Sequence, residues 1–140
     1  MCLFIKEKIT DKVLKKFADS DGKIVTMWKV VVMIDGRICT PYQEAIVRDG
    51  IFKSNRRTKK LRKLEIEDMQ IENGIHVFIN KIGATKETQG YTYRTVMPVY
   101  CRLKDFVAAG KFYCAQSAVF TKVEIKKEDL DAVKQELKRR

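Results

Sequence analysis

A chain of 140 residues with 45% hydrophobic residues is long enough to bury a core and too apolar for a disordered protein. Its formal net charge of +11, from 29 Lys and Arg against 18 Asp and Glu, favours nucleic acid or another polyanion as a partner, although many soluble proteins are basic for solubility alone. We expect one domain over residues 1–140, and no apolar stretch reaches the length of a membrane span.

The cysteine and histidine content argues against a classical zinc site. The four cysteines are separated by 37, 62 and 13 residues, so they form no CxxC pair, and the chain has one histidine. The apolar start of the chain is cut short by charged residues, so no secretory signal peptide is expected. We therefore predict a reducing compartment with four free, partly buried thiols, at Cys2, Cys39, Cys101 and Cys114.

The first half of the chain predicts a helix followed by a hairpin. An amphipathic helix is expected over residues 4–17, where apolar residues recur every four positions at Ile5, Ile9, Val13 and Phe17. The elements that follow are a turn at 19–22, a long strand over 24–34, a two-residue turn at 35–36 that returns through 37–40, an end to that strand at Pro41, and a further turn at 49–50.

The densest charge lies in residues 53–63, which hold seven basic residues and no acidic one. Like charges repel, so this segment gains little from folding alone and much from meeting phosphates or carboxylates. The segment contains no aromatic residue and matches no recognised DNA-binding motif, so binding at the level of phosphates, independent of sequence, is expected. The alternative is a solvated loop that meets the acidic segment 65–72 or an acidic protein. The predicted binding residues are Lys53, Arg56, Arg57, Lys59, Lys60, Arg62 and Lys63.

The second half predicts three strands, two helices and one helical turn. In order, these are a strand over 75–79 after the turn at 73–74, a helix over 81–88 capped by Asn80, a strand over 94–103, a helical turn over 104–109 closed by Gly110, a strand over 118–125, and a last helix with acidic residues from Glu128 and basic residues to Arg140. Alternation along the strand 94–103 places one set of side chains on a common face, namely Val96, Pro98, Tyr100 and Arg102. The order of elements predicts an α+β fold: a single domain with a mainly antiparallel sheet and an amphipathic helix at each end.

No residue marks a catalytic site. His76 lies in the middle of a predicted strand, with no Ser, Cys or Asp at a motif spacing, so we predict a structural role for it. Cys2 could act as an N-terminal nucleophile only after removal of Met1, and no partner residues for it can be identified. We therefore predict no enzymatic activity, no cofactor and no metal ion.

The stretch 74–84, with the pattern Gly-Ile-His, an aromatic residue, a few polar residues and an alanine that opens a helix, resembles an element of small uncharacterised viral proteins. These occur in bacteriophages and in large DNA viruses of the Marseillevirus type. Further similar segments are Met1-Cys2-Leu3-Phe4, Trp28-Lys29-Val30-Val31, Pro41-Tyr42 and Asp105-Phe106-Val107-Ala108-Ala109-Gly110. The resemblance implies a viral protein that resides in the host cell interior or in the virion and is not secreted. It brings no activity and assigns no site residue.

Three functional hypotheses follow. The first is a basic, non-enzymatic binding protein whose segment 53–63 contacts nucleic acid phosphates or an acidic protein surface. The second is a structural virion or capsid component that contacts other virion proteins. The third is a nucleotide-binding sponge or a nucleotide-handling enzyme, which the positive charge would also suit. None of the three involves a membrane.

Overall fold

A computed structural model describes residues 3–9, 14–40, 50–53, 70–71, 75–112 and 115–139. The described strands form one ten-stranded sheet, in which the pairings are antiparallel. With its helices the fold is α+β. In chain order the elements are β1 (Leu3–Ile9), η1 (Lys15–Phe17), β2 (Ile24–Ile34), β3 (Arg37–Cys39), β4 (Ile51–Lys53), β5 (Gln70–Ile71), β6 (Ile75–Phe78), α2 (Lys81–Lys86), β7 (Arg94–Arg102), η3 (Leu103–Asp105), β8 (Phe106–Phe112), β9 (Ala115–Phe120), β10 (Lys122–Glu124) and α3 (Lys127–Lys138).

The ladder between β2 and β7 forms the centre of the sheet, and it pairs every residue from Ile24 to Val32 with a partner in β7. The sequence of β2 is rich in β-branched and other apolar residues, which suit a strand covered on both faces. The turn to β3 has positive φ at Asp35 (51°) and Gly36 (75°), the conformation of the two-residue turn that matches the twist of a hairpin. The predicted strand 24–34 and its hairpin are therefore confirmed.

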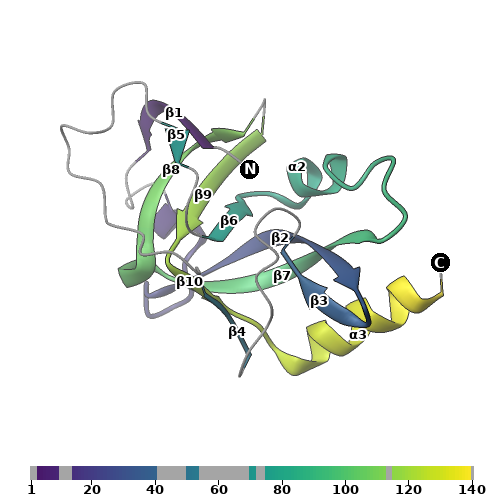
Figure 1. Cartoon of the computed structure of the whole chain (residues 1–140). Coiled ribbons are helices and arrows are strands. Elements are labelled where there is room, and N and C mark those ends of the chain that lie inside the picture. The colour runs from purple at the N-terminus through teal and green to yellow at the C-terminus, as the bar shows by residue number, and fades with distance from the viewer. Residues whose placement is uncertain are drawn as a thin grey trace.

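The sheet curls so that its two halves share one core. The strand order is β4-β10-β7-β2-β6-β9-β8-β1-β5, with β3 also on β2, and β8 and β9 bend across the β2–β7 ladder in Figure 1. Buried side chains of one cluster come from both halves, among them Met27, Val77 and Phe120. Burial of such side chains is the main favourable contribution to folding.

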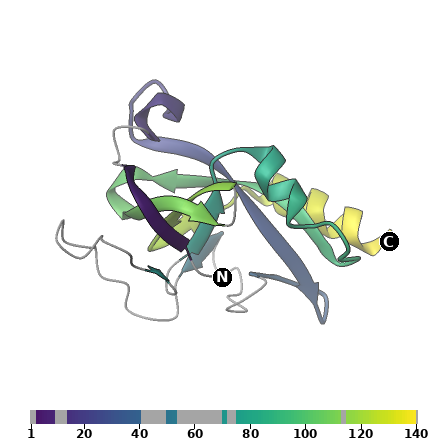
Figure 2. The same ribbon diagram turned by 90° about the horizontal axis from the view of Figure 1, so that it is seen from above.

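Both helices lie at the same end of the molecule in Figures 1 and 2, away from β8 and β9. The side chain of Asn80 accepts a hydrogen bond from the Gly83 N–H (2.8 Å), which confirms the predicted cap, and α2 ends at Lys86. Through Ala84 it packs on the face of the sheet that carries Phe78 and Val30.

The C-terminal helix is also confirmed. Its first turn carries Glu128 and Asp129 and its last turn Lys138, placements that the helix dipole favours. Val133 and Leu137 are buried in the core, so α3 covers the other face of the β2–β7 ladder. No helix within the described ranges has the length and apolarity that crossing a bilayer requires.

The predicted N-terminal helix over 4–17 is wrong. Residues 3–9 form β1, which pairs with β5 and β8. In the described part of 4–17, the helical residues are Leu14 and the three residues of η1. The reason lies in the spacing: apolar residues four apart share a face of a helix, but four is also a multiple of two, so the same spacing fits a regular strand equally well. Pairing with β8 decides between the two.

Two further boundaries differ from the prediction. The helical turn expected over 104–109 is confined to η3, and Gly110 lies inside β8 rather than closing a helix. The strand expected over 118–125 is divided at Thr121, whose N–H donates to the Asp105 carbonyl (2.9 Å). At that point the chain leaves β6 and β8 as neighbours and joins β4 and β7, which produces the corner of the curled sheet.

Candidate functional site

The basic segment begins at an edge of the sheet. Lys53 is the last residue of β4, which is the end strand of the sheet order, while Arg56, Arg57, Lys59, Lys60, Arg62 and Lys63 lie outside the described residues. The register of β4 on β10 puts Lys53 opposite Lys122. The segment predicted to bind polyanions therefore starts beside β10.

Gly50 fixes the start of β4 against the chain that follows β10. The Ile125 N–H donates to the Gly50 carbonyl (2.8 Å), and Gly50 has φ +72°. A Cβ at this position would lie 3.3 Å from the Ile125 carbonyl oxygen, so a side chain would be strained by its conformation and crowded as well. This close approach holds β4 and the entry to α3 together.

A row of side-chain positions crosses four strands next to this edge. Tyr100 of β7 is opposite Thr26 of β2 and Glu124 of β10, and Glu124 is in turn opposite Ile51 of β4. Alternation puts this row on the face of the sheet away from Cys101, which is buried in the core. Arg102 shares that face, as the sequence predicted, and its Nε donates to Glu124 Oε1 (2.8 Å).

A groove of about 480 Å³ lies along this row. Its base is formed by strand residues and its side by η1, which contributes Phe17, an aromatic ring that is 51% exposed. The lining side chains that carry the argument below are Phe17, Asp19, Thr26, Tyr100, Glu124 and Lys126. Such a volume lies within the range of small-molecule sites, and the mixture of rings and charges is typical of them.

Tyr100 is held between two charged groups of the α3 entry. Its hydroxyl donates to Asp129 Oδ2 (3.1 Å), and the Lys126 Nζ lies 4.3 Å from the centre of its ring. Partial burial, and after it the hydrogen bond to Asp129, raises the pKa of the Tyr100 hydroxyl above its ordinary value. Tyr100 is therefore neutral at physiological pH and presents a ring with a cation on it.

The acidic groups of the groove are already engaged at one oxygen each. Asp19 Oδ1 accepts from the N–H groups of Lys23 (3.1 Å) and Ile24 (3.4 Å), and Glu124 Oε1 accepts from Arg102. This hydrogen bond to Glu124 raises the pKa of Arg102, which is exposed to solvent. The lining thus holds two carboxylates and the Lys126 ammonium, and Arg102 lies next to it.

Lys29 and His76 are polar residues of the sheet that are buried next to each other. His76 is buried in β6, and its carbonyl accepts a hydrogen bond from the Lys29 Nζ (2.6 Å). This bond forms where β2 and β6 separate, because their ladder has the single partner pair Trp28 and Phe78. Burial lowers the pKa of Lys29 to about 7. Neither side chain is open to a ligand in the described structure.

Two of the four predicted free thiols are confirmed. Cys39 and Cys101 are free and buried, and burial raises the pKa of the Cys101 thiol well above its ordinary value, which makes it inert. Cys2 and Cys114 lie outside the described residues. Among the described side chains no group of three or more His, Cys, Asp or Glu could hold a metal ion.

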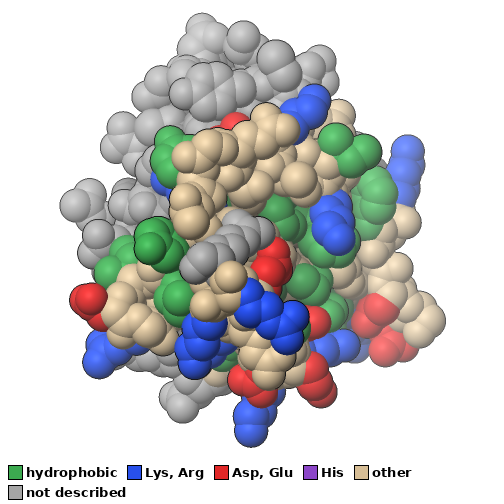
Figure 3. All heavy atoms as spheres, turned by 90° about the vertical axis from the view of Figure 1, so that its right-hand side faces the viewer, with side chains coloured by type: hydrophobic (Ala, Val, Ile, Leu, Met, Phe, Trp, Pro, Cys, Tyr) green, Lys and Arg blue, Asp and Glu red, His purple; other side chains and the backbone are tan. Residues whose placement is uncertain are grey.

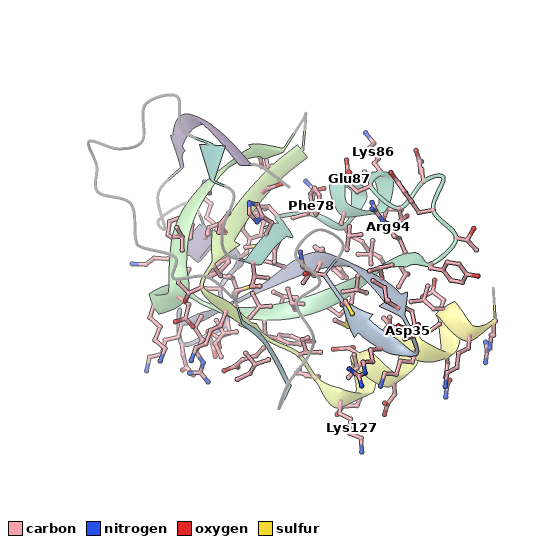
Figure 4. The ribbon with its side chains drawn as sticks, in the orientation of Figure 1. Asp35, Phe78, Lys86, Glu87, Arg94 and Lys127 are labelled. Atoms are coloured by element: carbon pink, nitrogen blue, oxygen red, sulfur yellow. The ribbon has the colours of Figure 1, made fainter. Side chains whose placement is uncertain are left out.

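A second aromatic and basic surface lies on the connection from α2 to β7. Tyr91 and Tyr93 are 54% and 56% exposed, and the Arg94 guanidinium stacks 3.7 Å from the centre of the Tyr91 ring. Arg94 lies near the end of α2, where Lys86 and Glu87 are labelled in Figure 4. In Figure 3, which faces this side of the molecule, Lys and Arg side chains are interspersed with Asp and Glu. The groove described above has none of these residues in its lining.

Sequence reasoning missed Phe17 and the groove. The spacing of apolar residues places Phe17 on the core-facing stripe of a helix that does not form, and Tyr100 is recognisable from the sequence only as a strand residue. The alternation along β7 does place Tyr100 and Arg102 on one face, but their meeting with Glu124 depends on the register of β10. No match to this chain was found among protein-family models, curated proteins or solved structures.

Proposed function

We propose that this protein binds nucleic acid, without reading its sequence, through contacts between basic side chains and phosphates. The observation that carries the proposal is the segment 53–63, with seven basic residues and no acidic one, in a chain of net charge +11. Neutralising phosphates releases condensed counterions, so such a segment binds nucleic acid strongly at low salt. The role proposed is binding and not catalysis.

The start of that segment supports the proposal. Lys53 ends β4, the end strand of the sheet order, at a position opposite Lys122 of β10, and the groove that Lys126 lines lies next to it. The charges that line the groove are mixed, so the positive excess that would attract a polyanion and speed its association comes from the segment 53–63 itself.

Charge neutralisation tests the proposal. The test variant replaces Arg56, Arg57, Lys59, Lys60, Arg62 and Lys63 with Gln, and binding to a DNA duplex is measured over a range of salt concentrations. Each phosphate contact contributes about 0.9 to the slope of log K against log salt for duplex DNA, so the variant should lose up to about 5 of that slope. It should also retain the fold, which circular dichroism checks, because a segment dense in like charges contributes little to folding.

A control variant with the same loss of charge separates a local from a general effect. It replaces six exposed residues elsewhere, namely Arg37, Lys86, Lys104, Lys127, Lys138 and Arg139. The proposal predicts a much smaller change of slope for this control. Equal slopes for the wild type and the 53–63 variant would refute it. Binding of an acidic protein together with no binding of DNA would replace nucleic acid by a protein partner.

From the resemblance to viral proteins we further propose where the protein acts, namely in an infected cell or in a virion. Purification of the protein from its native source tests that addition. Nuclease-sensitive nucleic acid that co-purifies with it would support the proposal. Recovery of the protein with other virion proteins only would favour the structural hypothesis.

A further inference from the structure

The groove beside Tyr100 offers more than a phosphate site needs. Phosphate contacts require cations, whereas this groove is lined by an exposed ring, a second ring, a hydroxyl and two carboxylates beside the single ammonium of Lys126. Resting on the function proposed above, we propose that the groove receives an unpaired base of single-stranded nucleic acid, stacked on Phe17, while the adjoining phosphates lie on the cations beside it.

The exposure of Phe17 supports the stacking role. The ring is 51% exposed and lines the groove from η1, a short element with no buried residue. A base has an apolar, polarisable face, and proteins that bind single strands use exposed aromatic rings as platforms for it. Tyr100 lines the same groove from the sheet, so a planar ligand meets aromatic groups from two elements.

The charges decide which part of a nucleotide enters. Asp19, Glu124 and Lys126 line the groove, and the two carboxylates outnumber the one ammonium, so a phosphate would be repelled there. The same carboxylates accept hydrogen bonds, so they suit a base with an amino group at its edge. Adenine, cytosine and guanine carry such an amino group, whereas an unpaired thymine offers these carboxylates only its ring N3–H. The groove therefore favours a base over a phosphate and an amino-bearing base over thymine.

The phosphates find cations next to the groove. Arg102 bonds to Glu124 and so lies beside the lining, and Lys122 shares a face of β10 with Glu124 because the two are separated by two positions. The Lys126 Nζ lies over the Tyr100 ring, within the lining. A strand whose base enters the groove would thus pass its backbone over three cations toward β4, where the basic segment begins.

The same arrangement distinguishes single strands from duplexes. The bases of a duplex are paired and stacked, so one of them could enter the groove only after flipping out at a cost in free energy. Phosphate contacts alone do not favour the single strand, because a duplex releases more counterions for each phosphate contact. Tighter binding of a single strand than of a duplex at equal salt is therefore the signature that the groove predicts.

The test measures binding of fluorescent oligo(dA), oligo(dT) and a mixed-sequence duplex, each about 12 nucleotides long to match the usual site size. The wild type should bind oligo(dA) more tightly than oligo(dT) or the duplex. Phe17→Ala should weaken oligo(dA) binding about tenfold, as expected for the loss of one stacked base. It should leave duplex binding and the salt slope unchanged.

Three controls make the result specific. Phe17→Tyr keeps the ring and should retain oligo(dA) affinity, while Phe17→Leu keeps apolar volume without the ring and should not. Tyr91→Ala removes an equally exposed ring from the other surface and should have no effect. Circular dichroism of each variant checks the fold. Adenosine monophosphate should displace oligo(dA) only at concentrations far above that of the strand, because it lacks the neighbouring phosphates.

The outcomes separate this inference from the function it rests on. Steep salt dependence with equal affinity of wild type and Phe17→Ala for oligo(dA) would overturn the groove proposal and keep the phosphate-binding function. Displacement by equimolar adenosine monophosphate would overturn the strand as occupant in favour of a free nucleotide. If the protein bound none of the three probes, both proposals would be overturned.

Discussion

The two ends of one sheet face differ in what covers them. On the outer face of the β2–β7 ladder, Val30 and Val96 lie under α2 with Phe78 and Ala84, and there the side chains are apolar. At the other end of the same face, Thr26 and Tyr100 line the open groove, which η1 and the entry to α3 flank. The residues on this face of β7 therefore change from apolar to amphipathic along the strand. In the function proposed above, the open end receives the nucleic acid and the covered end contributes stability.

The sharpest form of this comparison uses one phenylalanine from each end. Phe78 is 1% exposed under α2, and Phe17 is 51% exposed at the groove. Phe78→Ala should lower the free energy of unfolding by about 3–5 kcal/mol, because it removes buried apolar surface and leaves a cavity. Phe17→Ala should change it by less than about 0.5 kcal/mol. Urea unfolding of both variants checks this, and similar losses for the two would break the comparison.

The buried charge on the inner face of the same ladder makes a pH-dependent prediction. The Lys29 pKa is about 7 in the folded protein, against 10.5 for a lysine that is open to water, as in the unfolded chain. Between these values the unfolded chain holds a proton that the folded protein lacks. In this window the unfolded state binds more protons than the folded state. The free energy of unfolding therefore rises as the pH is raised from about 7 toward 10.5. Below pH 7 the whole cost of burying the ammonium is present.

Relative to a Lys29→Met variant, the wild type should gain on the order of 3 kcal/mol between pH 7 and pH 9.5. Urea unfolding of both proteins at several pH values measures this difference, which cancels the titration of other groups. A difference that does not depend on pH would show that Lys29 keeps an ordinary pKa. Nucleic acid binding should be the same for both proteins, because Lys29 lies away from the groove on the core side.

A smaller effect is expected at the cap of α2. Asn80→Ala removes the hydrogen bond to the Gly83 N–H and should destabilise the protein by about 1 kcal/mol. Asn80→Asp keeps an acceptor at this position and should lose much less. Neither variant should alter binding at the open end. Weaker oligo(dA) binding by Asn80→Ala, at a temperature where it is folded, would show that the two ends are coupled.

Much of the fold could be predicted where the signal is local. The long apolar run of β2, the Asp35-Gly36 turn, the Asn80 cap and the apolar stripe of α3 each specify their structure within a few residues. The N-terminal helix failed because a spacing of four fits strands as well as helices, so pairing with β8 decides. The division at Thr121 could not be seen locally, because its cause is a change of strand partner.

The site was predictable only in part. The charge of the segment 53–63 is plain in the sequence, and alternation placed Tyr100 and Arg102 on one face. The groove itself depends on the register that sets Glu124 opposite Tyr100 and on the position of η1, which brings Phe17 to them. These contacts join positions far apart in the chain, and no single segment encodes them.

Lysine modification in the presence and absence of oligo(dA) tests most directly whether nucleic acid binds at the open end. Lys122 and Lys126 represent this end, and Lys81 and Lys86 represent the α2 end. Mass spectrometry reports the protection of each lysine by the bound strand. The account predicts protection of Lys122, Lys126 and the lysines of 53–63, with Lys81 and Lys86 unchanged. Protection of Lys81 and Lys86, with Lys122 and Lys126 unchanged, would contradict it.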